Sequence, residues 1–78
     1  MNAKRRKEIF AIAQQLEELR DKVEDLQNEE QEAFDNMPEG LQDSERGEKA
    51  QEAVSNLEDA YTSIDEAINQ LSEATGEG

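Results

Sequence analysis

Carboxylates are the side chains in this sequence that are numerous enough to suggest a chemical role. The 78 residues include 21 Asp and Glu but only eight Lys and Arg, and there is no Cys and no His. Thiol chemistry, disulfides, Cys/His zinc sites and His-dependent catalytic triads are therefore excluded. Three roles remain for the carboxylates: metal ligands, general acids and bases, or a charged surface for a basic partner.

Metal binding and catalysis do not fit the pattern of the acids. Carboxylate sites for two metal ions in helical bundles use Glu-x-x-His motifs, which require histidine. The sequence has no Asp-x-Asp-x-Asp-Gly calcium loop, and acid–base catalysis needs a pocket that a pair of helices does not offer. We therefore expect no enzymatic activity, no catalytic or metal-binding residues and no cofactor.

A charged surface fits the acids of the C-terminal half, which recur every seven residues. Two helical turns, about 10 Å, separate successive members. We call this set, with its nearest acidic neighbours, the acidic ridge; it comprises Glu45, Glu52, Glu58, Asp59, Asp65, Glu66 and Glu73. Such a ridge could bind a basic protein in the way that nucleic-acid phosphates do. It could equally be the solvated exterior of a coiled coil, which keeps the protein in solution.

The charge balance is unusual for a solvated exterior. The net charge is −13, and the basic run at residues 4–7 contributes +4, so the rest of the chain carries −17. Coiled coils commonly pair Glu with Lys at i,i+4, whereas four bases follow residue 7: Arg20, Lys22, Arg46 and Lys49. Such a surface repels nucleic acid and anionic membranes and attracts basic proteins. We expect the basic run to pair with Glu73, Glu77 and the C-terminal carboxylate.

Two helices must position these acids. Residues 51–74 repeat a seven-residue unit in which an acid and an alanine precede a large apolar residue, and a second apolar residue follows three positions later. This heptad pattern predicts a second helix over about 44–75. A three-four apolar spacing predicts a first helix over about 3–35, and Pro38 and Gly40 mark a connector over 36–43.

The apolar positions define one seam on each helix. The first seam is Ile9, Ile12, Leu16, Leu19, Val23 and Leu26, and the second is Ala50, Val54, Leu57, Tyr61, Ile64, Ile68 and Leu71. Beside the second seam runs a stripe of small residues: Ala53, Ala60, Ala67 and Ala74. The expected fold is all-α, with residues 1–78 forming one antiparallel two-helix coiled-coil hairpin. Because its core is small, we expect a homo-oligomer in which two hairpins form a four-helix bundle.

The connector end offers a second candidate surface for a partner. We call the set Phe34, Met37, Leu41 and Arg46 the hairpin tip. Its apolar side chains could anchor another protein, while Leu41 could also close the end of the core. Gly47 follows in the second helix, where glycine costs about 1 kcal/mol relative to alanine. We therefore expect another chain segment to approach closely at this glycine.

The connector and its flanks resemble a known group of proteins. The segment Asp35-Asn-Met-Pro-Glu-Gly-Leu-Gln-Asp-Ser-Glu-Arg-Gly-Glu48 resembles the connector of small acidic helical-hairpin proteins from bacteriophages and prophages of Gram-positive bacteria. The preceding Glu29-Glu-Gln-Glu-Ala-Phe34 and the acid–alanine heptads are similar to the same group, which has no assigned activity. The resemblance implies a phage accessory protein directed at a host factor. It also implies roles for six residues: Asn36, Pro38, Leu41, Ser44, Arg46 and Gly47.

We therefore expect a non-enzymatic accessory protein that acts by protein–protein binding. Its acidic surface would imitate DNA and inhibit a basic host protein that handles nucleic acid or serves in defence. One alternative is a coiled-coil scaffold or assembly chaperone of a phage particle, and a second is an oligomeric sponge for a nucleotide signal. The sequence has no 18-residue apolar run and no signal-peptide core. The expected location is the cytoplasm of the host bacterium.

Overall fold

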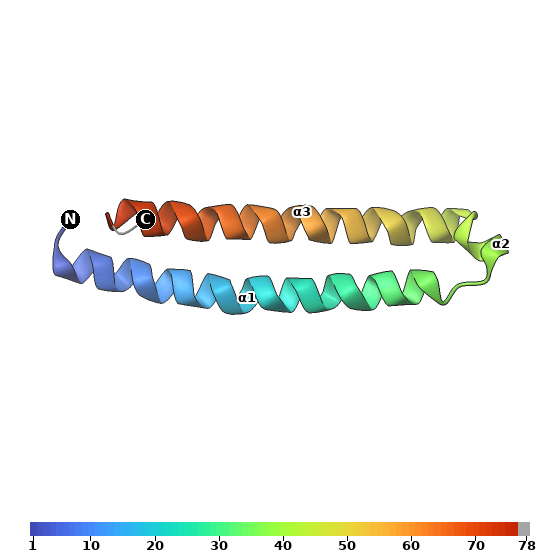
Figure 1. The fold of residues 1–78 in the computed structure, drawn as a ribbon, viewed down its shortest axis with the longest axis horizontal. Helices are drawn as coiled ribbons and strands as arrows, with labels where there is room; N and C mark the ends of the chain where they lie inside the picture. Colours follow the sequence, from blue (N-terminus) through green and yellow to red (C-terminus); the bar gives the residue numbers. More distant parts are fainter. Residues whose placement is uncertain (77–78) are drawn as a thin grey trace.

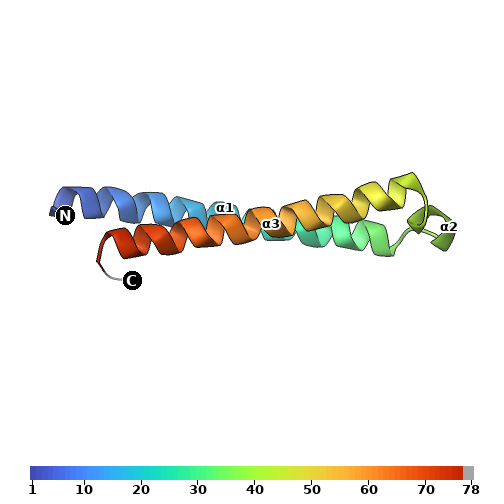
Figure 2. The same ribbon diagram turned by 90° about the horizontal axis from the view of Figure 1, so that it is seen from above.

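The computed structural model describes residues 1–76 and consists of two long helices joined by a short one. Helix α1 spans Ala3–Asp35, α2 is a single turn over Glu39–Gln42, and α3 spans Glu45–Ala74. Helix α1 packs along α3, with the start of α1 and the end of α3 at one end of the hairpin and α2 at the other (Figure 1). The rod measures 58 × 14 × 14 Å, and its helices cross when they are seen from above (Figure 2). The structure confirms the predicted all-α class and the helical hairpin.

Short local signals set the outer ends of the two long helices. Helix α1 begins after Asn2, whose side-chain oxygen accepts a hydrogen bond of 2.8 Å from the backbone N–H of Arg5. Helix α3 ends before Thr75, whose hydroxyl donates to the carbonyl of Ser72 at 2.6 Å. Gly76 then adopts a φ of +81°, a left-handed conformation that glycine takes at little cost. Gly76 therefore stops α3 next to the predicted end of the second helix, at about residue 75.

The face that α1 turns toward α3 differs from the predicted seam. Its half-buried residues follow a three-four spacing: Arg6, Ile9, Ala13, Leu16, Arg20, Val23, Gln27, Glu30 and Phe34. Three residues that the sequence placed in the seam, Ile12, Leu19 and Leu26, are 48%, 50% and 54% exposed. The prediction was therefore right for alternate members of this seam and wrong for these three. They lie beside the contact face, not in it.

Helix α3 turns its predicted seam toward α1. All seven seam residues from Ala50 to Leu71 are buried or half-buried, and Ala53, Ala60 and Ala67 are half-buried along one edge. Among the apolar side chains of residues 1–76, only those of Ala50 and Ile68 are buried, at 4% and 9% exposure, and α1 contains no buried residue. A single hairpin therefore has a thin core for a chain of this size.

The connector contains a helical turn that the sequence analysis did not predict. Helix α2 begins directly after Pro38, and Gln42 Nε2 donates a hydrogen bond of 3.1 Å to the carbonyl of Phe34. This bond ties α2 to the end of α1. The expectation that Leu41 closes the core is wrong, because its side chain is 42% exposed. Ser44 takes the N-cap position of α3, but its hydroxyl donates to the carbonyl of Leu41 and does not cap the helix.

Gly47 is the point where α3 touches α2. It is buried in the first turn of α3. A Cβ atom at this position would lie 2.6 Å from the carbonyl oxygen of Leu41 and still closer to that of Gln42. Both atoms belong to the backbone and cannot rotate away as a side chain could. The close approach that the sequence predicted at Gly47 is therefore confirmed.

Candidate functional site

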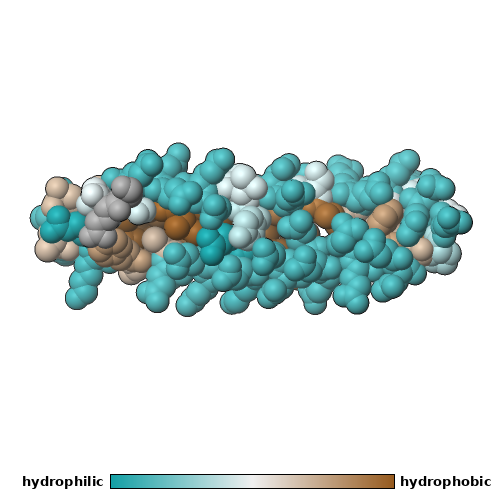
Figure 3. All heavy atoms as spheres, viewed as in Figure 1, coloured by the Kyte–Doolittle hydropathy of each residue, from teal (hydrophilic) through white to brown (hydrophobic). Residues whose placement is uncertain are grey.

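The acidic ridge lies along α3, and most of its carboxylates face solvent. Six members are exposed, and Asp65 is half-buried. Figure 3 shows hydrophilic side chains along the outer sides of both helices and hydrophobic ones mainly in the strip between them. Within residues 1–76, Glu45 is the one exposed ridge member with an ion pair, at 3.4 Å from Lys49 Nζ. The ridge therefore presents a row of carboxylates that few bases of the hairpin neutralise.

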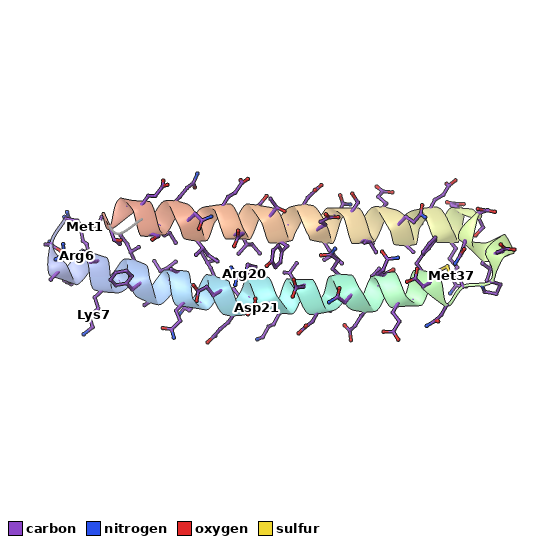
Figure 4. All side chains as sticks on the ribbon, in the orientation of Figure 1. Met1, Arg6, Lys7, Arg20, Asp21 and Met37 are labelled. Carbon is purple, nitrogen blue, oxygen red and sulfur yellow. The ribbon has the colours of Figure 1, made fainter. Side chains whose placement is uncertain are left out.

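Asp65 contributes to the contact between the helices. Its Oδ1 accepts a hydrogen bond of 2.8 Å from Arg20 Nη1. The Arg20 side chain reaches across from α1 (Figure 4). Its Cζ atom lies over the ring of Tyr61, 5.7 Å from the ring centroid. The hydrogen bond with Asp65 raises the pKa of Arg20, so the guanidinium stays charged. The structure thus gives Asp65 an intramolecular partner that the other central ridge acids lack.

Arg20 is a contact residue that the sequence analysis missed. It is four residues after Leu16 and three before Val23, a spacing that puts it on the same face of α1. An arginine can bury its methylene groups along an apolar seam while its charged end reaches the rim. Its side chain is accordingly only 23% exposed. The spacing of Arg20 was the sequence signal for its place on the contact face. The signal was missed because the residue is charged.

Asp65→Asn should lower the melting temperature of the hairpin by a few degrees. The substitution keeps the shape of the side chain but removes the negative charge that Arg20 meets at 2.8 Å. Asp59→Asn is the matched control, because it makes the same change at an exposed position without an ion pair in residues 1–76. Circular dichroism melts of both variants measure the effect. Equal melting temperatures would show that the Arg20 pair contributes nothing.

The acids give the rod a high linear charge density. The chain carries a net charge of −13, and the rod is 58 Å long. This is about one net negative charge per 4.5 Å of axis, compared with about 3.4 Å between phosphates along one DNA strand. Both helices contribute, because α1 has exposed acids on its outer side: Glu17, Glu18, Asp21, Glu24, Asp25, Glu32 and Asp35. A basic groove that follows a nucleic-acid backbone would meet a comparable row of charges here.

The hairpin tip does not form one exposed apolar patch. Phe34 and Met37 are half-buried, and only Leu41 of the three apolar residues is exposed. Phe34 lies on the contact face of α1, and its carbonyl accepts the bond from Gln42. Arg46 is exposed in the first turn of α3. The half-buried positions of Phe34 and Met37 follow from the way in which α1, α2 and α3 join at this end of the hairpin.

The structure tests one of the three pairings expected for the basic run at residues 4–7, the pairing with Glu73. Arg6 Nη1 donates to the carbonyl of Met1 at 3.3 Å, and the side chain of Lys7 points away from α3 (Figure 4). Within residues 1–76, no ion pair joins this run to Glu73. The other expected partners, Glu77 and the C-terminal carboxylate, lie outside the described residues.

Within residues 1–76, no group of three or more acidic side chains could hold a metal ion. None of the helices in this part of the chain is both long enough and apolar enough to cross a membrane. Comparison of the chain with protein-family models, with curated proteins and with solved structures finds no match.

Proposed function

We propose that this chain is a non-enzymatic accessory protein of phage type that binds a basic protein through its acidic ridge. The target is a bacterial cytoplasmic protein that handles nucleic acid or serves in defence, and binding inhibits it. The observation that carries the proposal is the row of exposed carboxylates along α3, on a rod 58 Å long with a net charge of −13. A cleft that binds phosphates presents bases along its length, and these bases would meet the ridge.

The ridge is a better candidate surface than the tip. Glu52, Asp59 and Glu66 are exposed, and they point away from the α1 contact because they lie opposite the seam residues on the helix. At the tip, Phe34 and Met37 are half-buried and serve the joint between the helices. A partner at the tip would find a single exposed apolar side chain, that of Leu41. Apolar anchors of protein interfaces normally cluster.

The proposal includes pairing of two antiparallel hairpins into a four-helix bundle. The thin core supports it, since Ala50 and Ile68 have the only buried apolar side chains of residues 1–76. Pairing also bears on target binding. Two rods side by side would carry about one net negative charge per 2.2 Å, compared with about 1.7 Å of axis per charge in duplex DNA.

A pull-down from bacterial lysate, at low and at high salt, tests the proposed function. We expect the tagged hairpin to capture a basic protein that handles nucleic acid and to release it as the salt concentration rises. Capture of a phage structural protein in place of such a target would support the alternative role as an assembly scaffold. Capture that persists at high salt would contradict binding through the ridge.

A sponge for a nucleotide signal finds less support in the structure. The hairpin has a cavity of about 300 Å³ between the first half of α1 and the end of α3. Its lining consists of apolar and neutral polar residues and one acid: Ile9, Phe10, Ala13, Glu17, Ile68, Asn69, Leu71 and Ser72. A phosphate needs bases or backbone N–H donors, and this lining supplies an acid.

A further inference from the structure

One long side of the hairpin carries a row of large apolar residues next to a row of alanines. Each row repeats every seven residues, and the large residues are about half exposed while the alanines are half-buried. We call the six residues the apolar face: Ile12, Leu19 and Leu26 on α1, and Ala53, Ala60 and Ala67 on α3. Nothing in residues 1–76 covers the three large side chains.

The handedness of the helices puts both rows on the same side of the hairpin. Each row directly precedes contact residues, as Leu19 precedes Arg20 on α1 and Ala60 precedes Tyr61 on α3. The chain runs out along α1 and back along α3 (Figure 1). When two right-handed helices pack with opposite chain directions, the residues directly before the contact positions of both helices lie on the same edge of the pair.

The opposite edge provides an independent check of this geometry. There, the relevant residues follow contact positions: Phe10 follows Ile9 on α1, and Ser72 follows Leu71 on α3. Both Phe10 and Ser72 line the same cavity, so they lie on one side. The residues that precede the contact positions must then share the other side.

The charges around the apolar face set it apart from the rest of the surface. Eight exposed residues border it, two acids, two bases and four neutral: Glu8, Gln15, Lys22, Glu29, Lys49, Asn56, Ser63 and Gln70. Their net charge is zero, although the chain as a whole carries −13. The opposite edge carries four acids and no base: Glu17, Glu24, Glu58 and Asp65. Two copies of so acidic a chain can approach closely only through the neutral side.

The two rows are also complementary in size. The large side chains, at seven-residue intervals, project from the surface as a raised row. The alanines, at the same interval, leave a shallow groove in which such a row can pack. Such a face fits a copy of itself, as the interface of a twofold dimer must. From Ile12 to Leu26 the row is about 21 Å long, at 1.5 Å per residue.

From these observations we propose that a second copy of this chain covers the apolar face. This deepens the proposed function, because it assigns the surface through which the hairpins pair and leaves both acidic ridges outside. The twofold axis runs parallel to the rods, so that α1 of each copy lies on α3 of the other. Each Ile12–Leu19–Leu26 row then packs on the partner's alanine row, and all neighbouring helices are antiparallel.

The contacts of Arg20 fix the level of the packing. Because Arg20 meets Tyr61 and Asp65, Leu19 lies along the rod between the levels of Ala60 and Ala67. In the dimer, it therefore enters between these two alanines of the second copy.

Charges placed in the apolar face test the choice of surface. In sedimentation equilibrium at micromolar concentration, the unaltered chain should have twice its mass of 8.8 kDa. Leu19→Glu with Leu26→Glu should weaken dimerisation by more than about 100-fold, because four unpaired carboxylates would be desolvated in each dimer. Gln14→Glu with Asn28→Glu adds the same charge at exposed positions away from this face and should leave the dimer intact.

Disulfide trapping tests the orientation, and it does not depend on destabilising variants. The chain has no Cys, so introduced thiols are the only ones present. An equal mixture of Leu19→Cys and Ala60→Cys chains, oxidised after subunit exchange, should yield mainly the mixed disulfide. Leu19→Cys alone should cross-link poorly, because the two copies of position 19 lie diagonally across the bundle, beyond the Cα separation of about 7 Å that a disulfide spans.

Three results would overturn the inference. They are a monomeric unaltered chain, equal weakening by the two charge variants, or a preference for the disulfide between two copies of position 19. None of these measurements involves a basic target. The proposal for the apolar face and the proposal for the acidic ridge can therefore be refuted independently of each other.

Discussion

Gly47→Ala should lower the free energy of unfolding of the hairpin by about 1–3 kcal/mol. Helix propensity alone would predict the opposite, because alanine is favoured over glycine by about 1 kcal/mol inside a helix. The added Cβ, however, would lie 2.6 Å from the carbonyl oxygen of Leu41 and closer to that of Gln42. Since both are backbone atoms, α2 must move away from α3, and the Gln42 bond to Phe34 at 3.1 Å would be strained or lost.

Gly40→Ala is the matched control for this prediction. Gly40 lies in α2, and a Cβ there would have no atom within 4 Å. This variant should therefore be neutral or slightly more stable, since alanine lowers the entropy of the unfolded chain. Urea unfolding followed by circular dichroism gives both free energies. A Gly47→Ala protein as stable as Gly40→Ala would show that the packing of α2 on α3 is not a constraint.

Reversing three ridge charges should abolish capture of a basic target without unfolding the hairpin. The substitutions are Glu52→Lys, Asp59→Lys and Glu66→Lys, at exposed positions opposite the α1 contact. The net charge would change from −13 to −7. The melting temperature should stay the same or rise, because the changes relieve repulsion within the chain. Asp65 is left unchanged, since its replacement would also break the pair with Arg20.

A second triple variant separates the ridge from net charge. Glu18→Lys, Asp25→Lys and Glu32→Lys change three exposed acids on the outer side of α1 and give the same net charge of −7. Capture from lysate, measured side by side, should persist in this control and fail in the ridge variant. If both variants lose capture equally, net charge and not the ridge attracts the target. If both retain it, another surface binds.

Sequence periodicity could predict the hairpin but not which side of α1 meets α3. The apolar sector of α1 is wide, because Ala13 lies on one side of Ile9 and Ile12 on the other. A pair of helices buries a narrower stripe than this sector. Heptad spacing alone cannot predict which half of the apolar sector contacts α3. In the structure, the contact is made by the half that contains Arg20, whose long side chain reaches Asp65.

The sequence could predict where the candidate site lies but not the contacts that its residues make within the hairpin. Seven-residue spacing located the ridge on α3, since it depends only on helix geometry. The intramolecular role of Asp65 depends on its pairing with a residue 45 positions away, and local patterns do not reveal such a pair. The helical turn α2 likewise depends on contacts of Gln42 with Phe34. Short irregular connectors leave few signals for such contacts in sequence.

The salt dependence of target capture tests the ridge most directly. Tagged wild-type hairpin and a Leu41→Ser variant, altered at the exposed apolar residue of the tip, are loaded with the captured target and washed with rising NaCl. The screening length falls from about 10 Å at 0.1 M to about 3 Å at 1 M. Binding through the ridge predicts that both proteins release the target over this range. Retention at 1 M by the wild type, with loss of capture in Leu41→Ser, would contradict the ridge and identify the tip as the binding surface.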